Sequence, residues 1–256
     1  MTEGGRSGNQ RIVYGVQPVR ELLRAGSQVR EVLLDRDRSR SEPVEELLAL
    51  AAAGGVRVRE VARSDIDHRA EGQVHQGVLA VAVPFPYWDL GQLLERTRAA
   101  GDPALLVALD GVTDPHNLGS VARTAEAAGA HGLIVPERRA ANVTPLVEKA
   151  AAGALAHLPV ARVANVGNTL IRLRDEHIWS IGLDAEGTTE LHACDLFTEP
   201  FVLIVGSEGR GLGRTSQLHC DLLVRLPMRG RVGSLNASVA AAVSMYEARR
   251  RRDSVA

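Results

Sequence analysis

Residues 201–213, FVLIVGSEGRGLG, and residues 222–237, LLVRLPMRGRVGSLNA, decide the fold. Each stretch starts with an apolar run of the length of a buried strand and continues into a polar loop. In the first loop, four glycines in eight positions permit a left-handed backbone and the close approach of a ligand. Open α/β sheets bind their ligands beyond the carboxyl ends of the strands. The two stretches therefore predict an α/β fold with a site at this edge of the sheet.

A helix is predicted directly after the second stretch, from about Ala237 to Arg250. Ser234 and Asn236 lie where this helix begins, and both residue types accept hydrogen bonds from the free N–H groups of a first helical turn. The apolar residues that follow have the spacing of one helix face, which predicts that this face is buried. They are Val239, Ala242, Val243 and Tyr246.

The remainder of the chain alternates between strand and helix patterns in two blocks. The first block has predicted strands at residues 29–34, 56–61 and 78–83 and predicted helices at 16–24, 43–53 and 64–68. Besides the two strands described above, the second block has predicted strands at 104–109, 132–135, 158–163 and 178–183 and predicted helices at 90–99, 118–128, 144–155 and 166–174. Strands that alternate with helices in this way predict a parallel sheet, here of about six strands.

The segment Pro84-Phe85-Pro86-Tyr87 interrupts any regular element between the two blocks, and we interpret it as the domain boundary. Four parts of the chain are expected. They are a disordered polar tail at residues 1–10, a small α/β domain at 11–83, a linker region at 84–100 and a larger α/β domain at 101–252.

The composition is that of an ordinary globular protein, because 45% of the 256 residues are hydrophobic, 24% are charged and the net charge is −1. The charge is unevenly distributed, since residues 226–252 contain six arginines and one acidic residue, Glu247. A basic segment of this kind is typical of nucleic-acid binding. The arginines at the end of the predicted helix also fit a simpler role, as cations that complement the helix dipole.

Several common sites are excluded by spacing. The Gly-x-Gly-x-x-Gly pattern of dinucleotide sites fails at Arg214, and the phosphate-binding loop fails because Leu212 stands where that motif needs lysine. The two cysteines, Cys194 and Cys220, form neither a disulfide framework nor a metal motif. The chain has no signal-peptide pattern and no apolar run of membrane-spanning length. We therefore expect a cytoplasmic protein that binds neither a metal ion nor a membrane.

Three segments resemble, almost letter for letter, the three motifs of the SpoU (TrmH) branch of the SPOUT methyltransferases. They are LDGVTDPHNLGSVAR at residues 109–123, FVLIVGSEGRG at 201–211 and LPMRGRVGSLNASVA at 226–240. Three co-linear motifs are far more specific than any single one. The first domain, with its Tyr14-Gly15-Val16 and His75-Gln76-Gly77-Val78 segments, is similar to the ribosomal-protein-like substrate-binding domain of RlmB-type guanosine 2′-O-methyltransferases of 23S ribosomal RNA.

The resemblance implies a fold and an activity. The C-terminal segment would thread through a loop to form a trefoil knot, and the protein would be a homodimer whose subunits complete each other's sites. The implied reaction is transfer of a methyl group from S-adenosylmethionine to a ribose 2′-hydroxyl, of a guanosine in 23S ribosomal RNA. The alternatives are methylation of transfer RNA or of another ribosomal nucleotide, including an antibiotic-resistance methylation, and a non-catalytic RNA-binding ribosome-assembly factor.

Site residues are also implied by the resemblance. The cofactor would be held, chiefly through main-chain groups, by Gly206, Leu226, Met228 and Leu235. The catalytic residues would be Asn117, Arg123, Glu208, Ser234 and Asn236.

Arg123 is expected to act as a cation that clamps a phosphate and stabilises a developing alkoxide, because a guanidinium in general keeps its proton up to about pH 12. Asn117 also fits the N-cap of the helix predicted at 118–128. An RNA-binding patch would combine Arg229 and Arg231 with arginines of the first domain, which are Arg11, Arg20 and Arg24.

Overall fold

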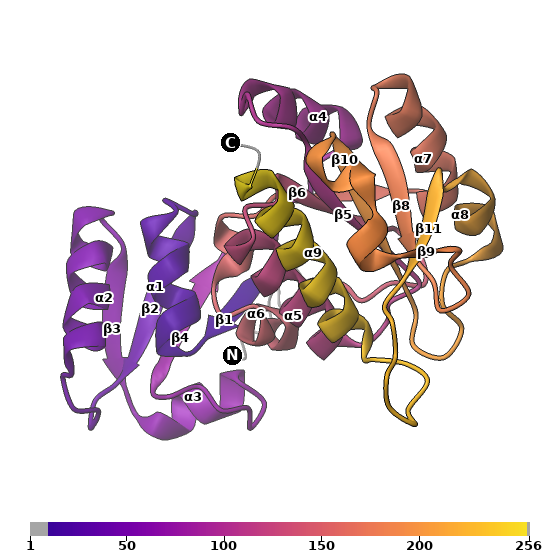
Figure 1. Cartoon of the computed structure of the whole chain (residues 1–256). Helices are drawn as coiled ribbons and strands as arrows, with labels where there is room; N and C mark the ends of the chain where they lie inside the picture. Colours follow the sequence, from indigo (N-terminus) through magenta and orange to yellow (C-terminus); the bar gives the residue numbers. More distant parts are fainter. Residues whose placement is uncertain (1–9, 255–256) are drawn as a thin grey trace. The chain divides into compact units, whose positions relative to one another are not determined.

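The computed structural model describes residues 10–254. The disordered tail expected at residues 1–10 lies outside this range except for Gln10. The chain forms two compact units (Figure 1). Within the described range, the first unit contains residues 10–86 together with Val143–His157, and the second contains Tyr87–Asn142 and residues 158–254.

The first unit is built on a four-stranded sheet in the order β1-β4-β2-β3. Strand β4 runs antiparallel to β1 and β2, whereas β2 and β3 are parallel. The elements are β1 (Arg11–Tyr14), α1 (Val16–Arg24), β2 (Val29–Asp35), α2 (Glu42–Ala53), β3 (Arg57–Val61), α3 (Arg63–Arg69) and β4 (Val78–Ala82). The sequence predicts all of these elements except β1, whose four residues are too few to show a periodic pattern.

Helices cover both faces of this first sheet. On one face, Val32 and Ala80 form a core with the apolar sides of α1 and α2. On the other face, Leu33 and Leu79 pack with Ile66 of α3. Alternate side chains of β2 and β4 thus enter two different cores. This explains why β4 is apolar throughout and why β2 is apolar from Val32 to Leu34.

Segment 143–157, which follows β6 in the chain, belongs to the first unit. Its helix α6 (Pro145–Ala150) contacts β1, and the buried carboxylate of Glu148 forms an ion pair with Arg11. The single helix expected at 144–155 is interrupted, because Ala152 and Gly153 adopt left-handed φ angles of 52° and 100°. A short 3₁₀ turn, η1 (Ala154–Ala156), follows.

The second unit contains a seven-stranded sheet in the order β7-β6-β5-β10-β8-β11-β9, in which every strand pair is parallel. The strands are β5 (Leu105–Asp110), β6 (Gly132–Pro136), β7 (Val160–Val163), β8 (Trp179–Leu183), β9 (Thr189–Glu190), β10 (Phe201–Gly206) and β11 (Leu222–Arg225). The predicted parallel α/β fold is thus confirmed. The strand beyond the predicted six is β9, whose two residues lie at the edge of the sheet and give no sequence pattern.

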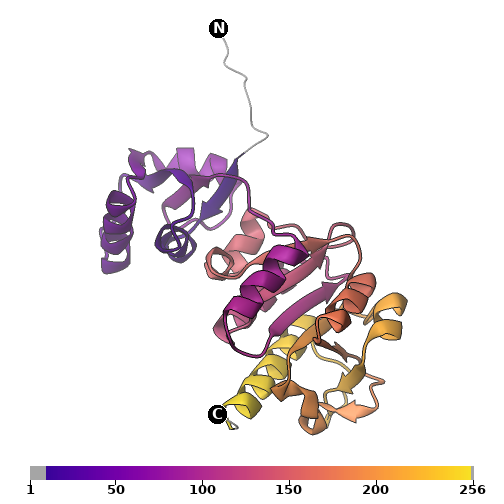
Figure 2. The same ribbon diagram turned by 90° about the horizontal axis from the view of Figure 1, so that it is seen from above.

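Both faces of the second sheet are covered by helices. Val202 and Ile204 of β10 point into a core formed with α4 (Leu90–Ala99) and α7 (Val166–Asp175). Helix α9 (Ala237–Asp253) packs against β10 and lies beside α5 (Pro115–Ala127) (Figure 1). In Figure 2, α9 is one continuous helix near the end of the chain.

Helix α9 buries a different face from the one that its apolar spacing predicts. Val239, Val243 and Tyr246 are 47%, 41% and 53% exposed, so the predicted buried face is wrong. The side turned toward β10 and α5 consists mainly of small residues, because small side chains allow the close packing of helix against sheet. Its buried residues are Ala237, Ala241, Ser244, Met245, Glu247 and Ala248.

Two arginines at the end of α9 donate hydrogen bonds to main-chain carbonyl groups of the neighbouring segments. Arg252 donates hydrogen bonds of 2.7–2.9 Å to four carbonyl oxygens, and Arg249 donates one of 2.8 Å to Ala128 O. The four acceptors of Arg252 are Pro103, Ala104, Phe197 and Glu199. Burial lowers the pKa of Arg252 to about 10, so the side chain is still charged at neutral pH. Arg249 and Arg252 are therefore structural residues rather than members of a free basic patch.

Candidate active site

The site lies at the carboxyl ends of β5 and β10, two neighbouring parallel strands whose last residues, Asp110 and Gly206, are paired. The loop after β5 leads into α5, and the loop after β10 leads into α8 (Arg214–His219). The segment after β11 leads into α9, which packs against α5. The three sequence motifs therefore meet at one edge of the sheet.

Asn117, Glu208 and Asn236, one from each motif, form a triangle of hydrogen bonds. Asn117 Nδ2 donates to Glu208 Oε1 at 3.0 Å, and Asn236 Nδ2 donates to Asn117 Oδ1 at 2.9 Å. Asn236 Nδ2 also donates to Glu208 Oε1, which thus accepts two bonds. Asn117 is only 4% exposed. Because hydrogen bonds to a carboxylate are stronger than those between neutral groups, the triangle fixes the three side chains relative to one another.

Asn117 can reach Glu208 because it does not cap its own helix. Helix α5 begins at Pro115, and Asp114 caps it by accepting hydrogen bonds from the N–H groups of His116 and Asn117. The predicted role of Asn117 as N-cap, with a helix start at residue 118, is therefore wrong. The sequence does contain the correct signal, since aspartate is a preferred N-cap and proline is favoured at the first helical position.

Asn236, in contrast, caps α9 as predicted. Its Oδ1 accepts hydrogen bonds from the N–H groups of Ser238 and Val239, at 2.9 and 3.3 Å. The cap uses the side-chain oxygen, which leaves the nitrogen to donate to Asn117 and Glu208. Ser234 is exposed and makes no hydrogen bond with any residue between 10 and 254, so the structure does not bring it into the triangle.

Glycine is required at position 206 because the loop after β10 folds back over it. Ser207 and Gly211 exchange two main-chain hydrogen bonds of 2.9 Å, and a Cβ atom on Gly206 would overlap the main chain of Gly211. Asp110 Oδ2 accepts a hydrogen bond of 2.8 Å from the N–H of Gly213, which ties this loop to the end of β5. The sequence reasoning missed Asp110, although its place at a strand end within the first motif is a signal for it.

Arg123 lies on the exposed side of α5, away from the buried Leu118, Ala122 and Ala125. It follows Asn117 by six residues, which is about 9 Å along a helix axis. Its guanidinium makes no hydrogen bond or ion pair within the described part of the chain. The side chain is therefore available for an anionic ligand.

The residues predicted to hold a cofactor follow β11. Leu226 is half-buried, whereas Met228 and Leu235 are partly exposed. From Met228 to Leu235 the chain has no regular structure, and its main-chain N–H and C=O groups make no hydrogen bond with residues 10–254. Free main-chain groups beside apolar side chains suit a ligand that has both polar and apolar parts.

The predicted basic patch is only partly available. Arg229 and Arg231 are exposed and have no ion-pair partner among the described residues. The three arginines of the first unit that were assigned to the patch are each paired with glutamate, and their part in RNA binding stays a prediction. Arg11 pairs with Glu148, Arg20 with Glu46, and Arg24 with both Glu21 and Glu46.

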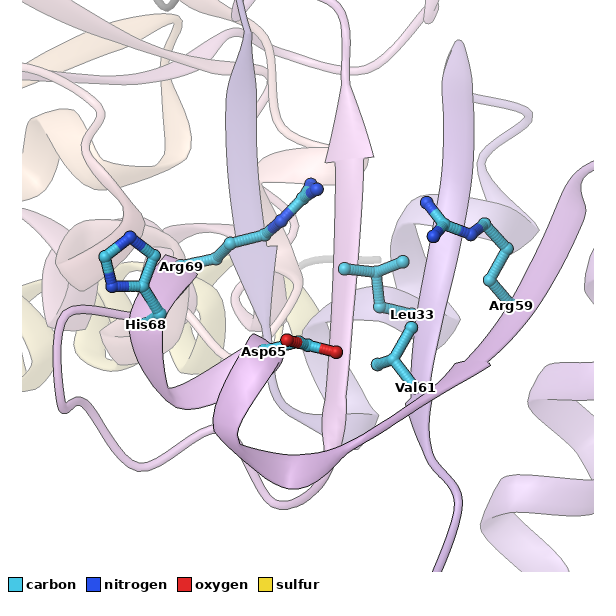
Figure 3. A pocket seen from close by; sticks show the side chains of 6 residues that line it. All are labelled: Leu33, Arg59, Val61, Asp65, His68 and Arg69. Carbon is cyan, nitrogen blue, oxygen red and sulfur yellow. The ribbon is translucent and has the colours of Figure 1, made fainter. Parts of the chain in front are cut away.

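A pocket of about 340 Å³ lies in the first unit, between β2, β3 and α3 (Figure 3). Two apolar side chains and four polar ones line it, and none of them is among the predicted site residues. The apolar ones are Leu33 and Val61, and the polar ones are Arg59, Asp65, His68 and Arg69.

Two further searches of residues 10–254 gave negative results. No three histidine, cysteine, aspartate or glutamate side chains in this range are arranged to hold a metal ion. No helix in the range has the length and apolar character needed to cross a membrane.

Comparison with known proteins identifies the family. Residues 104–246 match the SpoU rRNA Methylase family, and residues 12–88 match the family described as RNA 2'-O ribose methyltransferase substrate binding. The 23S rRNA (guanosine-2'-O-)-methyltransferase RlmB of Pseudomonas putida is 46% identical over 94% of this chain and 96% of its own length. The chain belongs to the SpoU rRNA methylase family. The resemblance seen in the sequence motifs is thus confirmed.

Other relatives also match this SpoU methylase over nearly the whole length of both chains. The putative TrmH family tRNA/rRNA methyltransferase YacO of Bacillus subtilis is 39% identical over 95% of this chain and 96% of its own length. The crystal structure of the SpoU methyltransferase AviRb from Streptomyces viridochromogenes, in complex with the cofactor AdoMet, superposes with a TM-score of 0.79 at 34% identity. That match covers 96% of this chain and 91% of the AviRb chain, so the fold is shared over both units of the SpoU methylase.

Proposed function

We propose that this SpoU methylase transfers a methyl group from S-adenosylmethionine to the ribose 2′-hydroxyl of a guanosine in 23S ribosomal RNA. The observation that carries the proposal is the triangle of Asn117, Glu208 and Asn236, which assembles one residue of each motif at the ligand-binding edge of the sheet. The choice of substrate rests on the Pseudomonas putida relative, which is named as a guanosine methyltransferase of 23S rRNA.

A ribose hydroxyl is a weak acid, so the site has to orient it and stabilise the oxyanion that develops as it attacks. Arg123 is proposed for the second task, because its guanidinium is exposed and unpaired within residues 10–254. The same cation would clamp the phosphate next to the target ribose through charged hydrogen bonds.

Glu208 and its two amide partners are proposed to orient the substrate. Oε1 of Glu208 is occupied by the bonds from Asn117 and Asn236, whereas its Oε2 has no partner in the described range. A held carboxylate with one free oxygen can accept a hydrogen bond from the ribose. Ser234, which is exposed after β11, is proposed to contact the substrate or the cofactor once either is bound.

S-adenosylmethionine, when bound, supplies a methyl group on a positively charged sulfur atom. The residues after β11 fit this ligand, because the main chain from Met228 to Leu235 offers free donors and acceptors. Leu226, Met228 and Leu235 add apolar contacts, and Gly206 keeps the adjoining loop free of a side chain. AviRb, a relative of known structure, was crystallised with this cofactor.

The proposal includes a trefoil knot in the second unit. Strand β11 lies next to β8, yet the chain then returns to α9, which packs on β10 and α5. A segment that crosses the ends of β8 and β10 in this way has the course expected of a knotted C-terminal segment.

We also propose a homodimer formed through α9. Val239, Val243 and Tyr246 follow one another at helical spacing on its exposed side, and contiguous exposed apolar side chains mark interaction surfaces. Asn236 caps the same helix, so a second copy of the chain at this surface would lie next to the triangle. The protein would act in the cytoplasm, with residues 11–83 contributing RNA binding and residues 101–252 the chemistry.

Methyl transfer to ribosomal RNA tests the proposed function. Ribosomal RNA from cells that lack this gene is incubated with the protein and S-adenosylmethionine that carries a tritiated methyl group. The RNA is then digested, and the labelled nucleoside is identified. We expect label in 2′-O-methylguanosine from 23S RNA. Label in another nucleoside or in transfer RNA would change the substrate, and no label in any RNA would contradict the proposed activity.

A further inference from the structure

The loop between β6 and α6 carries two adjacent arginines, Arg138 and Arg139, that no sequence motif includes. Both side chains are exposed, and neither makes a hydrogen bond or ion pair with any residue in the range 10–254. Some other exposed arginines of the second unit are paired, such as Arg98 with Glu176 and Arg174 with Asp221. The two free guanidiniums therefore form a small cationic surface, which we call the Arg138–Arg139 pair.

The main chain of this loop is held firmly although its arginines are free. The N–H of Glu137 donates to Val163 O at 2.8 Å, and the N–H of Ala141 donates to Val112 O at 3.0 Å. Between these two anchors, Arg139 has a left-handed φ of 59°. A residue other than glycine with this φ is uncommon and costs about 1 kcal/mol or more, so glycine can replace Arg139 without backbone strain.

The location of the pair connects it to the active site. Val112, the acceptor of the bond from Ala141, lies in the loop that joins Asp110 of β5 to the start of α5. The same loop leads to Asn117 in the first turn of α5. The Arg138–Arg139 pair thus lies at the carboxyl edge of the sheet, on the side of β6, while the loop after β10 lies on the other side of β5.

We infer that the Arg138–Arg139 pair binds phosphate groups of the RNA strand on one side of the target nucleotide. This inference rests on the proposed function and adds a binding site to it. Guanidinium groups bind phosphate through paired charged hydrogen bonds, and contacts to phosphates position a nucleic acid without reading its sequence. The pair therefore contributes to affinity and register, whereas Arg123 acts at the reacting ribose itself.

The test compares two double variants in the full-length protein. Arg138→Ala with Arg139→Gly removes both charges, and glycine suits the left-handed φ at position 139, so the loop is not strained. The control is Arg96→Ala with Arg172→Ala, which removes two exposed charges from the last turns of α4 and α7. These helices precede β5 and β8, so the control positions lie at the opposite edge of the sheet.

Binding of a 23S RNA fragment is measured at several salt concentrations, without turnover. For the Arg138→Ala/Arg139→Gly variant we expect about tenfold weaker binding and a decrease of roughly 1 to 2 in the slope of log affinity against log salt. Binding of S-adenosylmethionine and the rate at saturating RNA should stay close to the wild-type values. The variant Arg138→Lys/Arg139→Lys keeps the charge and should keep most of the affinity.

Three outcomes would overturn the inference. The first is RNA affinity and salt dependence equal to those of the control variant. The second is loss of S-adenosylmethionine binding, which would assign the pair to the cofactor. The third is equal loss in the lysine variant, which would indicate a structural role. Because binding is measured separately from methyl transfer, failure of the proposed activity can be distinguished from failure of this inference.

Discussion

Asn236 donates a hydrogen bond of 2.9 Å to Asn117 although 119 residues separate them in the sequence. The bond joins the N-cap of α9 to the first turn of α5, and both side chains also donate to Glu208. One carboxylate oxygen thus holds two segments that lie far apart along the chain. This arrangement makes Glu208 the residue on which the geometry of the triangle depends.

Replacing Glu208 with alanine should abolish methyl transfer while the protein stays folded. The substitution leaves the amide nitrogen of the buried Asn117 without its acceptor. We expect a decrease of at least about a hundredfold in kcat/KM and a loss of about 1 to 3 kcal/mol in the free energy of unfolding. Glu126→Ala, at an exposed position of α5, is the matched control and should change neither quantity. Full activity of Glu208→Ala would remove the triangle from the site.

Arg123→Lys tests whether Arg123 acts as a cation, as proposed, or as a proton acceptor. If the side chain acts as a cation, lysine should keep part of the activity, while Arg123→Ala should lose about a thousandfold or more in kcat. The measurement is the methyl-transfer rate of both variants from about pH 7 to pH 10, a range that ends near the usual lysine pKa of about 10.4. If the side chain acts as a cation, the rate of the lysine variant should fall as the pH approaches about 10.4, because the lysine loses its charge there. A rate that rises there instead would favour a proton-accepting role.

Gly206→Ala should disrupt the loop after β10, because its new Cβ would overlap the main chain of Gly211. We expect loss of S-adenosylmethionine binding and a destabilisation of about 1 to 3 kcal/mol, as is typical of an overpacked buried position. Gly54→Ala, at the end of α2 in the first unit, is the matched control, since no atom comes closer than 3.4 Å to a Cβ placed there. Cofactor binding by calorimetry and thermal unfolding measure the two effects. Normal cofactor binding by Gly206→Ala would contradict the proposed location of the cofactor.

Much of the fold is predictable from local pattern, because the buried strands of a parallel sheet are short apolar runs between turn residues. The run from Phe201 to Val205 is an example, and β10 is indeed central in the sheet. Two strands escape this reasoning. Strand β1 starts with a charged residue and has four residues, and β9 has two and depends on pairing with β11.

The site is predictable as a set of residues but not as a geometry. The motifs place Asn117, Glu208 and Asn236 at strand or helix ends, yet no local signal shows that one carboxylate oxygen accepts from both amides. Capping was misassigned at α5 because asparagine and aspartate are comparable N-caps and only the structure shows which one is used.

Long-range pairing limits what charge counts and apolar spacing can predict. Arg11 is neutralised by Glu148, which lies 137 residues away in the sequence. The face that α9 buries depends on how closely β10 and α5 approach it, and this distance is a property of the tertiary structure. Small residues therefore occupy the buried side of α9, although the spacing of its large apolar residues predicts that the other side is buried.

The exposed side of α9 gives a prediction about assembly. Val243→Asp places a charge in the middle of the apolar row formed by Val239, Val243 and Tyr246, which should prevent a second copy from docking there. We expect a monomer at micromolar concentration by sedimentation, with a strong decrease in methyl transfer. Leu218→Asp, at a more exposed apolar residue on α8, is the control and should leave the oligomeric state unchanged. A wild-type protein that is already monomeric and fully active would contradict the proposed homodimer.

Glu247 gives a prediction about acid stability. Its carboxylate accepts hydrogen bonds from Arg250 at 2.9 Å and from Arg251 at 3.1 Å, and these bonds lower its pKa from 4.5 to about 2. A carboxyl whose pKa is lower in the folded state stabilises the protein above its unfolded pKa, and this stabilisation is lost as the pH falls toward the folded pKa. The relevant window is therefore about pH 4.5 down to about pH 2.

Urea unfolding of wild type and Glu247→Gln across this window measures the effect. Because the Arg250 side chain is largely solvated, we expect a difference of only about 1 kcal/mol near neutral pH, which should shrink as the pH falls below about 4.5. Glu186→Gln, at an exposed glutamate whose side chain has no ion pair within residues 10–254, is the control and should show no such difference. A difference between Glu247→Gln and wild type that stays constant from neutral to acid pH would show that the ionised carboxylate does not stabilise the end of α9.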